Sequence, residues 1–406
     1  MEPSRLSILR AKMDTELGTS YIPKLIARQP KLFSPGMLQL ISKGERTFTR
    51  VDEHIGNSDY LECVSNTLLN MEALSAAIID GAEVDLLGLL MHDIKKGKNY
   101  DPSKTRVSSS STNRAIQYRD YIGTHNSCSN MDDFVFNKES ILNIHEELNY
   151  PVDSGFKRRY RGEGSDSPNS LHPRLPQRRT LPPEDIEEYM EDLFKFCNTD
   201  YYTPQIQASL AHFQLEYIRP FKSRVDALGR QVSYVIYAKR HFTKNINVAM
   251  AVESIRRIDN PLDNLTANNE NGVKQSPLEL WIYHGANVLV RQADMILEME
   301  QKYISIEEKW RATVTKVRHD DICDILMHDL LAHPIINAKY VAERCNKTLP
   351  AANDALKKLV SAKILAPIDN RKRNRYFYAV DILDYYRSLL DEIIPRGWLP
   401  GVELFN

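Results

Sequence analysis

The residues best suited to chemistry lie in HFQLEYIRPFKSRVDALGR, residues 212–230. The pattern predicts a helix that ends near Ile218, an irregular loop, and a second helix that starts near Gly229. Backbone N–H groups at a helix N-terminus bind phosphate well, and a glycine there lets the ligand approach closely. Asp226 could hold a hydrated Mg²⁺, and Arg230 could pair with a phosphate through two hydrogen bonds. The stretch is a candidate anion site, and the alternative is a basic loop between two helices.

The elements around this stretch are predicted to be helical. Apolar residues recur at spacings of three and four through residues 60–80, where Gly81 follows as a helix stop, and through residues 205–218. Further helices are expected from Asn113, over residues 136–150 and after Pro182. Little of the chain alternates with period two, so the sequence predicts a mainly α fold.

The tail, residues 318–406, has a different pattern. Three short helices are followed by two β-rich pieces around a basic turn, which is the order of elements in a winged helix-turn-helix. Residues 349–362 would form the recognition helix, and a basic cluster suits phosphate contacts. The candidate DNA-binding residues are Lys357, Lys358, Arg371, Lys372, Arg373 and Arg375. The alternative is a module that contacts protein only.

Composition excludes several classes of function. The 406 residues carry a formal net charge of −1, which indicates no polyanionic or membrane partner for the molecule as a whole. No apolar run is long enough to span a bilayer, and the N-terminus lacks a signal-peptide pattern. The five scattered cysteines favour a reduced, cytoplasmic setting. No P-loop occurs, and the histidines show no zinc-binding spacing.

The stretch 212–230 resembles the signature of the Fic (Fido) family. Five of its residues fall in step with the family motif up to the loop: Phe213, Glu216, Ile218, Pro220 and Phe221. Gly229 and Arg230 close the motif. ALSAAIIDG, residues 73–81, resembles the inhibitory helix of the family, and TLPPEDIEEYMEDLFKF resembles the segment after its target-binding flap. The resemblance covers roughly residues 20–300 together with the tail.

The resemblance implies an organisation and a chemistry. The fold would be a Fic-type helical core with a small β-hairpin flap and a C-terminal winged helix. The expected units are an N-terminal helical segment (1–110), the core (111–305), a connector (306–317) and the winged helix (318–406). The family transfers AMP from ATP to a hydroxyl group of a target protein. Its motif histidine is the general base, an acid holds Mg²⁺, and a glycine-rich backbone with an arginine binds the phosphates.

When the family motif is aligned with this chain, the position of the catalytic histidine is changed. Arg219 stands where the base should be, and a guanidinium stays protonated and cannot accept a proton. Losing a positioned base typically costs ~10²–10⁴-fold in rate. Three residues are inserted between Phe221 and Arg230. The alignment then places Asp226 at the metal acid and leaves a cradle of Ala227, Leu228, Gly229 and Arg230.

The partners of the motif are changed as well. Ser233 stands where the second arginine is expected, and Asp80 stands at the inhibitory glutamate. Asp80 is therefore expected to lack its ion-pair partner. His212, about two helical turns before Arg219, and Asp226 are the other candidate bases.

Three functions follow from this reading. The first is a degenerate Fic-like regulator that responds to a nucleotide or a partner and binds DNA through its tail. The second is an active protein adenylyltransferase with a changed mechanism. The third is an interaction scaffold. ATP with Mg²⁺ is the candidate cofactor. A nucleotide, DNA, a target protein and a second copy of the chain are the candidate partners, and no membrane partner is expected.

Overall fold

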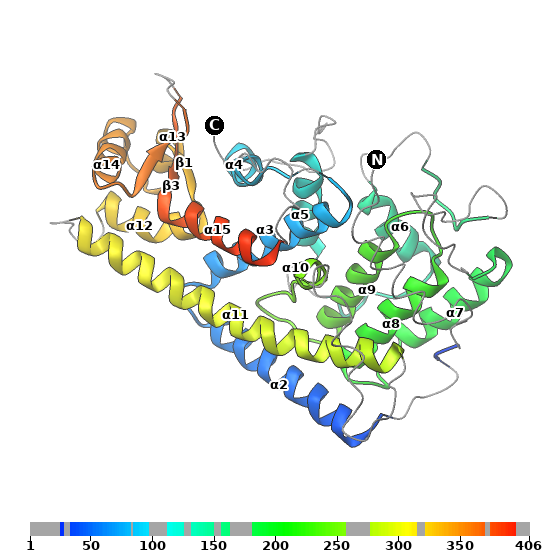
Figure 1. The fold of residues 1–406 in the computed structure, drawn as a ribbon. Coiled ribbons are helices and arrows are strands. Elements are labelled where there is room, and N and C mark those ends of the chain that lie inside the picture. Colours follow the sequence, from blue (N-terminus) through cyan, green and yellow to red (C-terminus); the bar gives the residue numbers. More distant parts are fainter. Residues whose placement is uncertain are drawn as a thin grey trace.

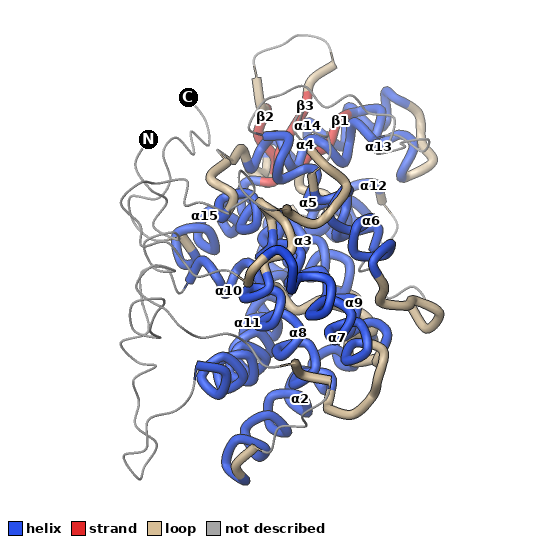
Figure 2. Tube along the Cα trace, turned by 90° about the vertical axis from the view of Figure 1, so that its right-hand side faces the viewer, coloured by secondary structure: helices blue, strands red, loops and turns tan. Residues whose placement is uncertain are grey.

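The structure is a computed structural model that describes residues 25–27, 33–82, 84–96, 112–125, 131–149, 156–162, 181–256, 277–314, 321–369 and 374–394. These residues form a mainly α fold, as predicted (Figures 1 and 2). The helices before the motif are α2 (Pro35–Gly56), α3 (Leu61–Ile79), α4 (Leu86–Lys96), α5 (Thr112–His125), α6 (Lys138–Leu148), the 3₁₀ turn η2 (Pro183–Asp185) and α7 (Ile186–Cys197). Then come α8 (Pro204–Ile218), α9 (Val225–Lys239), α10 (Met250–Arg256) and α11 (Pro277–Thr313).

Two long helices, α2 and α11, lie side by side along one flank of the molecule (Figure 1). They approach closely at Gly44, where an added Cβ would lie 2.6 Å from the carbonyl oxygen of Ala286. With 37 residues, α11 is roughly 55 Å long at 1.5 Å per residue, and it continues beyond α2 to reach the tail. The expected connector, residues 306–317, is therefore helical as far as Thr313.

Helix α3 runs through the interior. It is apolar on most of its surface, and it packs against α5, α10, α11 and α12. The helix ends at Ile79 with Asp80 as its C-cap, and Gly81 then adopts a φ of 77°, which glycine tolerates without steric cost. The helix and the stop predicted from residues 60–81 are thus observed.

The tail begins with α12 (Ile322–Ala332), β1 (Ile335–Asn337), α13 (Ala338–Arg344) and α14 (Leu349–Ser361). It ends with β2 (Leu365–Pro367), β3 (Tyr376–Ala379) and α15 (Val380–Ile393). The three strands form an antiparallel sheet in the order β1-β3-β2, at one end of the molecule (Figure 2). The predicted helices and hairpin are present, and β1 is an additional strand.

The expected β-hairpin flap cannot be followed. The flap is expected around residues 157–164 and 173–179. Of these, residues 157–162 contain no strand, and residues 163–180 lie outside the described part of the chain. The strands found in the described residues all belong to the tail.

Candidate functional site

Arg219 ends α8. It has left-handed backbone angles (φ 46°, ψ 64°), and its N–H donates to the carbonyl oxygen of Leu215. The side chain is only 17% exposed, and its Nη1 lies 3.9 Å from Oε2 of Glu216. The position expected for the base therefore holds a largely buried cation beside a carboxylate. No proton acceptor is contributed by this side chain.

Arg161 supports the loop that follows Arg219. Its buried guanidinium donates to the carbonyl oxygens of Arg219 (2.7 Å), Ile218 (3.4 Å) and Leu181. Its backbone N–H donates to the carbonyl oxygen of Pro220 at 2.9 Å. The Arg161 cation thus satisfies carbonyl groups that have no intrahelical partner at the C-terminal end of α8. Its positive charge also interacts favourably with the negative end of the helix dipole.

The loop is further fixed by aromatic packing. The ring of His145, on α6, stacks on Phe221 with 3.7 Å between ring centroids and an angle of 7°. Its Nε2 lies 3.2 Å from the carbonyl oxygen of Ser223. Burial lowers the pKa of His145 to about 4, so this imidazole is neutral at neutral pH and serves to pack the loop.

Helix α9 begins earlier than the sequence suggested. It starts at Val225 rather than near Gly229, and the N–H of Leu228 already donates to the carbonyl oxygen of Arg224 at 2.9 Å. The backbone groups without an intrahelical acceptor are then those of residues 224–227. The amide of Leu228 is engaged and Gly229 lies inside the helix, so the backbone cradle expected at these two residues is closed.

The space beside Gly229, where the family motif would bind a phosphate, is filled by the side chain of His212. A Cβ at this position would lie 2.1 Å from Cδ2 and 2.6 Å from Nε2 of His212, on the facing helix α8. The His212 ring therefore sits directly over the glycine. Trp281, on α11, packs edge-on against the same ring with centroids 5.2 Å apart.

Arg230 is buried in a network of charges. Its side chain is 2% exposed, and its Nη1 donates to Oδ2 of Asp226. Burial opposes its charge, but the carboxylates of Asp226 and Glu72 raise the pKa of Arg230 above its ordinary value. Glu72, on α3, accepts from the N–H groups of Ala251 and Val252 at the start of α10. Burial raises the pKa of Glu72, although Arg230 acts in the opposite direction.

Asp80 does have an ion-pair partner, contrary to expectation. Arg224, within the inserted loop, donates through Nη1 to Oδ2 of Asp80 and binds the Tyr118 hydroxyl oxygen at 3.0 Å. Tyr118 also donates to Asp80 at 2.6 Å. The insertion thus supplies an arginine to Asp80, while Ser233 is buried and donates to the carbonyl oxygen of Gly229.

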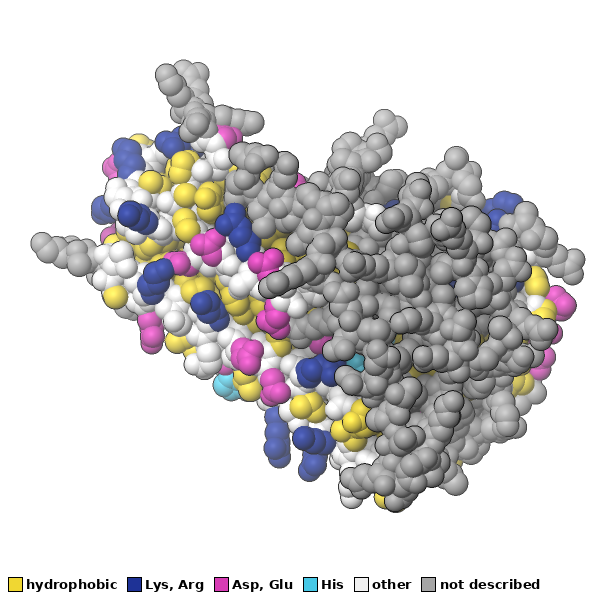
Figure 3. Space-filling model, viewed as in Figure 1, with side chains coloured by type: hydrophobic (Ala, Val, Ile, Leu, Met, Phe, Trp, Pro, Cys, Tyr) yellow, Lys and Arg dark blue, Asp and Glu magenta, His cyan; other side chains and the backbone are white. Residues whose placement is uncertain are grey.

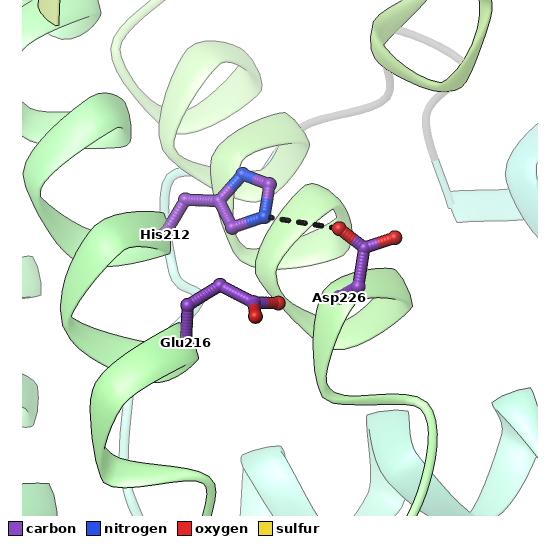
Figure 4. Close-up of side chains that lie close together, drawn as sticks. All are labelled: His212, Glu216 and Asp226. Atoms are coloured by element: carbon purple, nitrogen blue, oxygen red, sulfur yellow. Dashed lines mark ion pairs between the residues drawn. The ribbon is translucent and has the colours of Figure 1, made fainter. Parts of the chain in front are cut away.

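Three potential ligands meet between α8 and α9. His212 and Glu216 project from α8 toward Asp226, in the first turn of α9 (Figure 4). One ligand atom from each residue lies within 4.8 Å of the other two. His212 Nε2 is 3.7 Å from Asp226 Oδ1. Of the three, only Asp226 is predicted from the sequence to bind a metal. The four-residue spacing of His212 and Glu216, which puts both on one helix face, was the available signal.

The candidate DNA-binding residues lie in different parts of the tail. Lys357 and Lys358 are exposed on α14, and Lys357 Nζ pairs with Asp354 at 3.0 Å. Arg375 is exposed beside the ring of Phe377. Arg371, Lys372 and Arg373 lie outside the described residues. On the face shown in Figure 3, basic side chains over the tail and α11 alternate with acidic ones rather than forming one patch.

The fold and the site define a helical protein with a Fic-like motif between two packed helices. Residues 135–223 match the sequence model described as "Fic/DOC family", which confirms the resemblance over that segment. The match ends before Asp226, Gly229 and Arg230. Comparison with curated proteins gives no match. No described helix is long and apolar enough to cross a membrane.

Two solved structures show a general likeness. One is a Fic family protein from Desulfovibrio desulfuricans G20, with 14% identity, a TM-score of 0.47, and coverage of 89% of this chain and 98% of that one. The other is Fic-1 from C. elegans, with 15% identity, a TM-score of 0.44, and coverage of 65% and 74%.

Proposed function

We propose that this chain is a Fic-like regulator that does not transfer AMP efficiently. The observation that carries the proposal is Arg219, a largely buried arginine at the position where the Fic motif has its general base. A guanidinium cannot take the proton of an attacking hydroxyl group. Two neighbouring contacts also argue against efficient AMP transfer. Arg230 binds the carboxylate of Asp226, and the N–H of Leu228 donates to the carbonyl oxygen of Arg224, so neither group is fully available to Mg²⁺ or phosphate. The alternative, an active adenylyltransferase, needs another base in reach of the target.

A nucleotide is the proposed signal, bound at the start of α9. The N–H groups of residues 224–227 at the N-terminus of α9, the exposed Lys222 and the carboxylate of Asp226, of which Arg230 binds one oxygen, fit a triphosphate with Mg²⁺. The backbone of Leu228 and Gly229 does not fit the role that the family gives it, because it is already part of a helix. Bound Mg²⁺ would neutralise phosphate charge, and this chain's own residues would hold and orient the phosphates.

The test is calorimetric titration of the full chain with ATP and Mg²⁺. Arg230 is a poor probe because its removal would leave buried carboxylates unpaired. Lys222→Glu is better, since the side chain is exposed. Lys195→Glu, an exposed lysine on α7, is the matched control. We expect saturable binding that Lys222→Glu weakens about 5- to 10-fold and Lys195→Glu leaves unchanged, consistent with about 1 kcal/mol for one charge-assisted contact. An absence of heat at high ATP concentration would refute nucleotide binding.

DNA binding through the tail is a second proposed function. In support, the tail has the element order of a winged helix, and α14 presents two exposed lysines. The test is DNA binding at several salt concentrations with the double variant Lys357→Glu, Lys358→Glu. If both lysines contact phosphates, the slope of log affinity against log salt falls by about 2. The exposed Lys302 of α11 provides the control substitution. An unchanged slope would show that α14 does not face DNA.

A further inference from the structure

His212 contains an unsatisfied buried atom. The residue is 4% exposed, and its Nε2 has no hydrogen-bond partner among the described residues. Asp226 Oδ1 is the facing oxygen, at 3.7 Å, which is too long for a hydrogen bond. Buried polar atoms are satisfied in the great majority of cases, so an open imidazole nitrogen that points at carboxylates marks a position for a bound water or ion.

We propose that His212, Glu216 and Asp226 bind a divalent transition-metal ion, with zinc as the probe of choice. The three ligand atoms already lie within 4.8 Å of one another (Figure 4). Two ligands of one tetrahedral zinc ion, each at about 2.0–2.2 Å from the metal, lie roughly 3.4 Å apart. The separation of 3.7 Å between His212 Nε2 and Asp226 Oδ1 is close to this value, and a pair at the 4.8 Å limit would need to close by about 1.4 Å. One coordination position would remain for a water molecule, on the side of Asp226, whose side chain is 15% exposed.

The donor set decides which class of ion fits. Mg²⁺ binds oxygen ligands and keeps most of its water, whereas imidazole nitrogen suits zinc and related ions. One imidazole with two carboxylates is therefore a transition-metal set. This site shares Asp226 with the proposed nucleotide Mg²⁺, but it adds His212 and Glu216 as ligands and does not require a nucleotide.

The surroundings hold the ligands in place. Gly229 and Trp281 confine the His212 ring from two sides. Arg230 binds Oδ2 of Asp226 and leaves Oδ1 toward His212. Such contacts beyond the ligands orient a metal site. Two arginines, Arg219 and Arg230, also offset the two carboxylate charges, so electrostatic attraction for cations in general is weak. We expect the imidazole nitrogen to set the selectivity for zinc over Mg²⁺.

The experiment is calorimetric titration of the full, chelator-treated chain with Zn²⁺, without nucleotide. His212→Gln and Glu216→Gln remove one ligand each. The control is His284→Gln, another helix histidine whose Nε2 lacks a hydrogen-bond partner. We expect one zinc site that both ligand variants weaken at least ~10-fold and the control leaves intact, by comparison with the 10- to 100-fold effects known for supporting residues. Mg²⁺ should not compete.

Two outcomes would overturn the inference. One is that the wild-type chain binds no zinc. The other is that the two ligand variants bind as much zinc as wild type, which would place the ion elsewhere, for example at a cysteine. Circular dichroism checks that each variant folds, and if His212→Gln does not, Glu216→Gln decides the question. ATP binding is measured in a separate titration with Mg²⁺. A chain that binds no zinc would therefore leave the proposed nucleotide binding intact, and a chain that binds no ATP would leave the proposed zinc site intact.

Discussion

Glu307 should stabilise the junction between the helical core and the tail, and its contribution can be worked out from its contacts. Oε1 of this carboxylate accepts from Arg311 at 2.7 Å, and Oε2 accepts from the Tyr60 hydroxyl at 2.9 Å and lies 3.2 Å from His328 Nδ1. Burial opposes the charged form, but the bonds from His328, Arg311 and Tyr60 prevail and lower the pKa of Glu307 from 4.5 to about 2. The Glu307 carboxylate is only 8% exposed, whereas Arg311 and His328 are 44% and 45% exposed, so solvent screens these contacts in part.

The shift fixes both the size and the pH range of the effect. At about 1.4 kcal/mol per pKa unit, it corresponds to roughly 3 kcal/mol of stability. Because the folded-state pKa is the lower one, this stability is fully present above pH 4.5 and is lost as the pH falls toward 2. Glu307→Gln should therefore cost about 3 kcal/mol at pH 7 and about 1.4 kcal/mol at pH 3.

Urea unfolding followed by tryptophan fluorescence measures the difference, since Trp310 lies one helical turn away. Glu308→Gln removes the same charge at the adjacent exposed position and should change stability by less than about 0.5 kcal/mol. A cost for Glu307→Gln that is the same at pH 7 and pH 3 would refute the electrostatic reasoning. An independent readout is His328, whose pKa is raised mainly by the bond to Glu307 and should fall in the variant, as seen by NMR titration.

Three further outcomes are expected. Arg219→His alone should not produce AMP transfer in a labelled-ATP assay, because the inserted loop and the closed backbone cradle remain; transfer by this variant would contradict the proposed loss of activity. Arg161→Ala should lower the free energy of unfolding in urea by roughly 2–3 kcal/mol, because three carbonyl groups lose a charged donor. The control Arg159→Ala, at an exposed position, should cost less than about 0.5 kcal/mol in the same experiment. Glu72→Ala should cost about 3–5 kcal/mol by leaving the buried Ala251 amide and Tyr234 hydroxyl without their acceptor, and Glu72→Gln should cost clearly less because it keeps an acceptor; equal losses in thermal unfolding would show that the acceptor is unimportant.

Helix type and order could be predicted from the sequence because they depend on local periodicity. The apolar spacing of residues 60–80 and 205–218 places α3 and α8 within one or two residues of their observed bounds. The start of α9 could not be predicted in this way. Its N-cap is Arg224 in a left-handed conformation without a side-chain cap, so the usual Ser, Thr, Asp or Asn signal is missing.

The contacts of the site depend on partners far apart in the chain. Asp80 meets Arg224 across 144 positions, and the family motif gives no reason to expect an arginine in the insertion to reach it. Strand β1 has three residues, too few to alternate, and its pairing with β3 crosses some forty positions. Such features follow from packing, which local patterns do not encode.

Helix α3 contacts both the candidate site and the tail, which bears on the proposed regulatory function. Near its C-terminal end, Asp80 binds Arg224 at the start of α9. Near its N-terminal end, Glu62 lies 3.0 Å from His333, which ends α12 of the tail. Midway, Asn70 donates to the hydroxyl oxygen of Tyr386 on α15 at 2.9 Å. A ligand that changed the position of α12 or α15 would have to break contacts on the same helix that holds the loop of the candidate site. If the proposed regulator couples the two regions, we expect α3 to carry the effect, because this buried helix makes polar contacts to both.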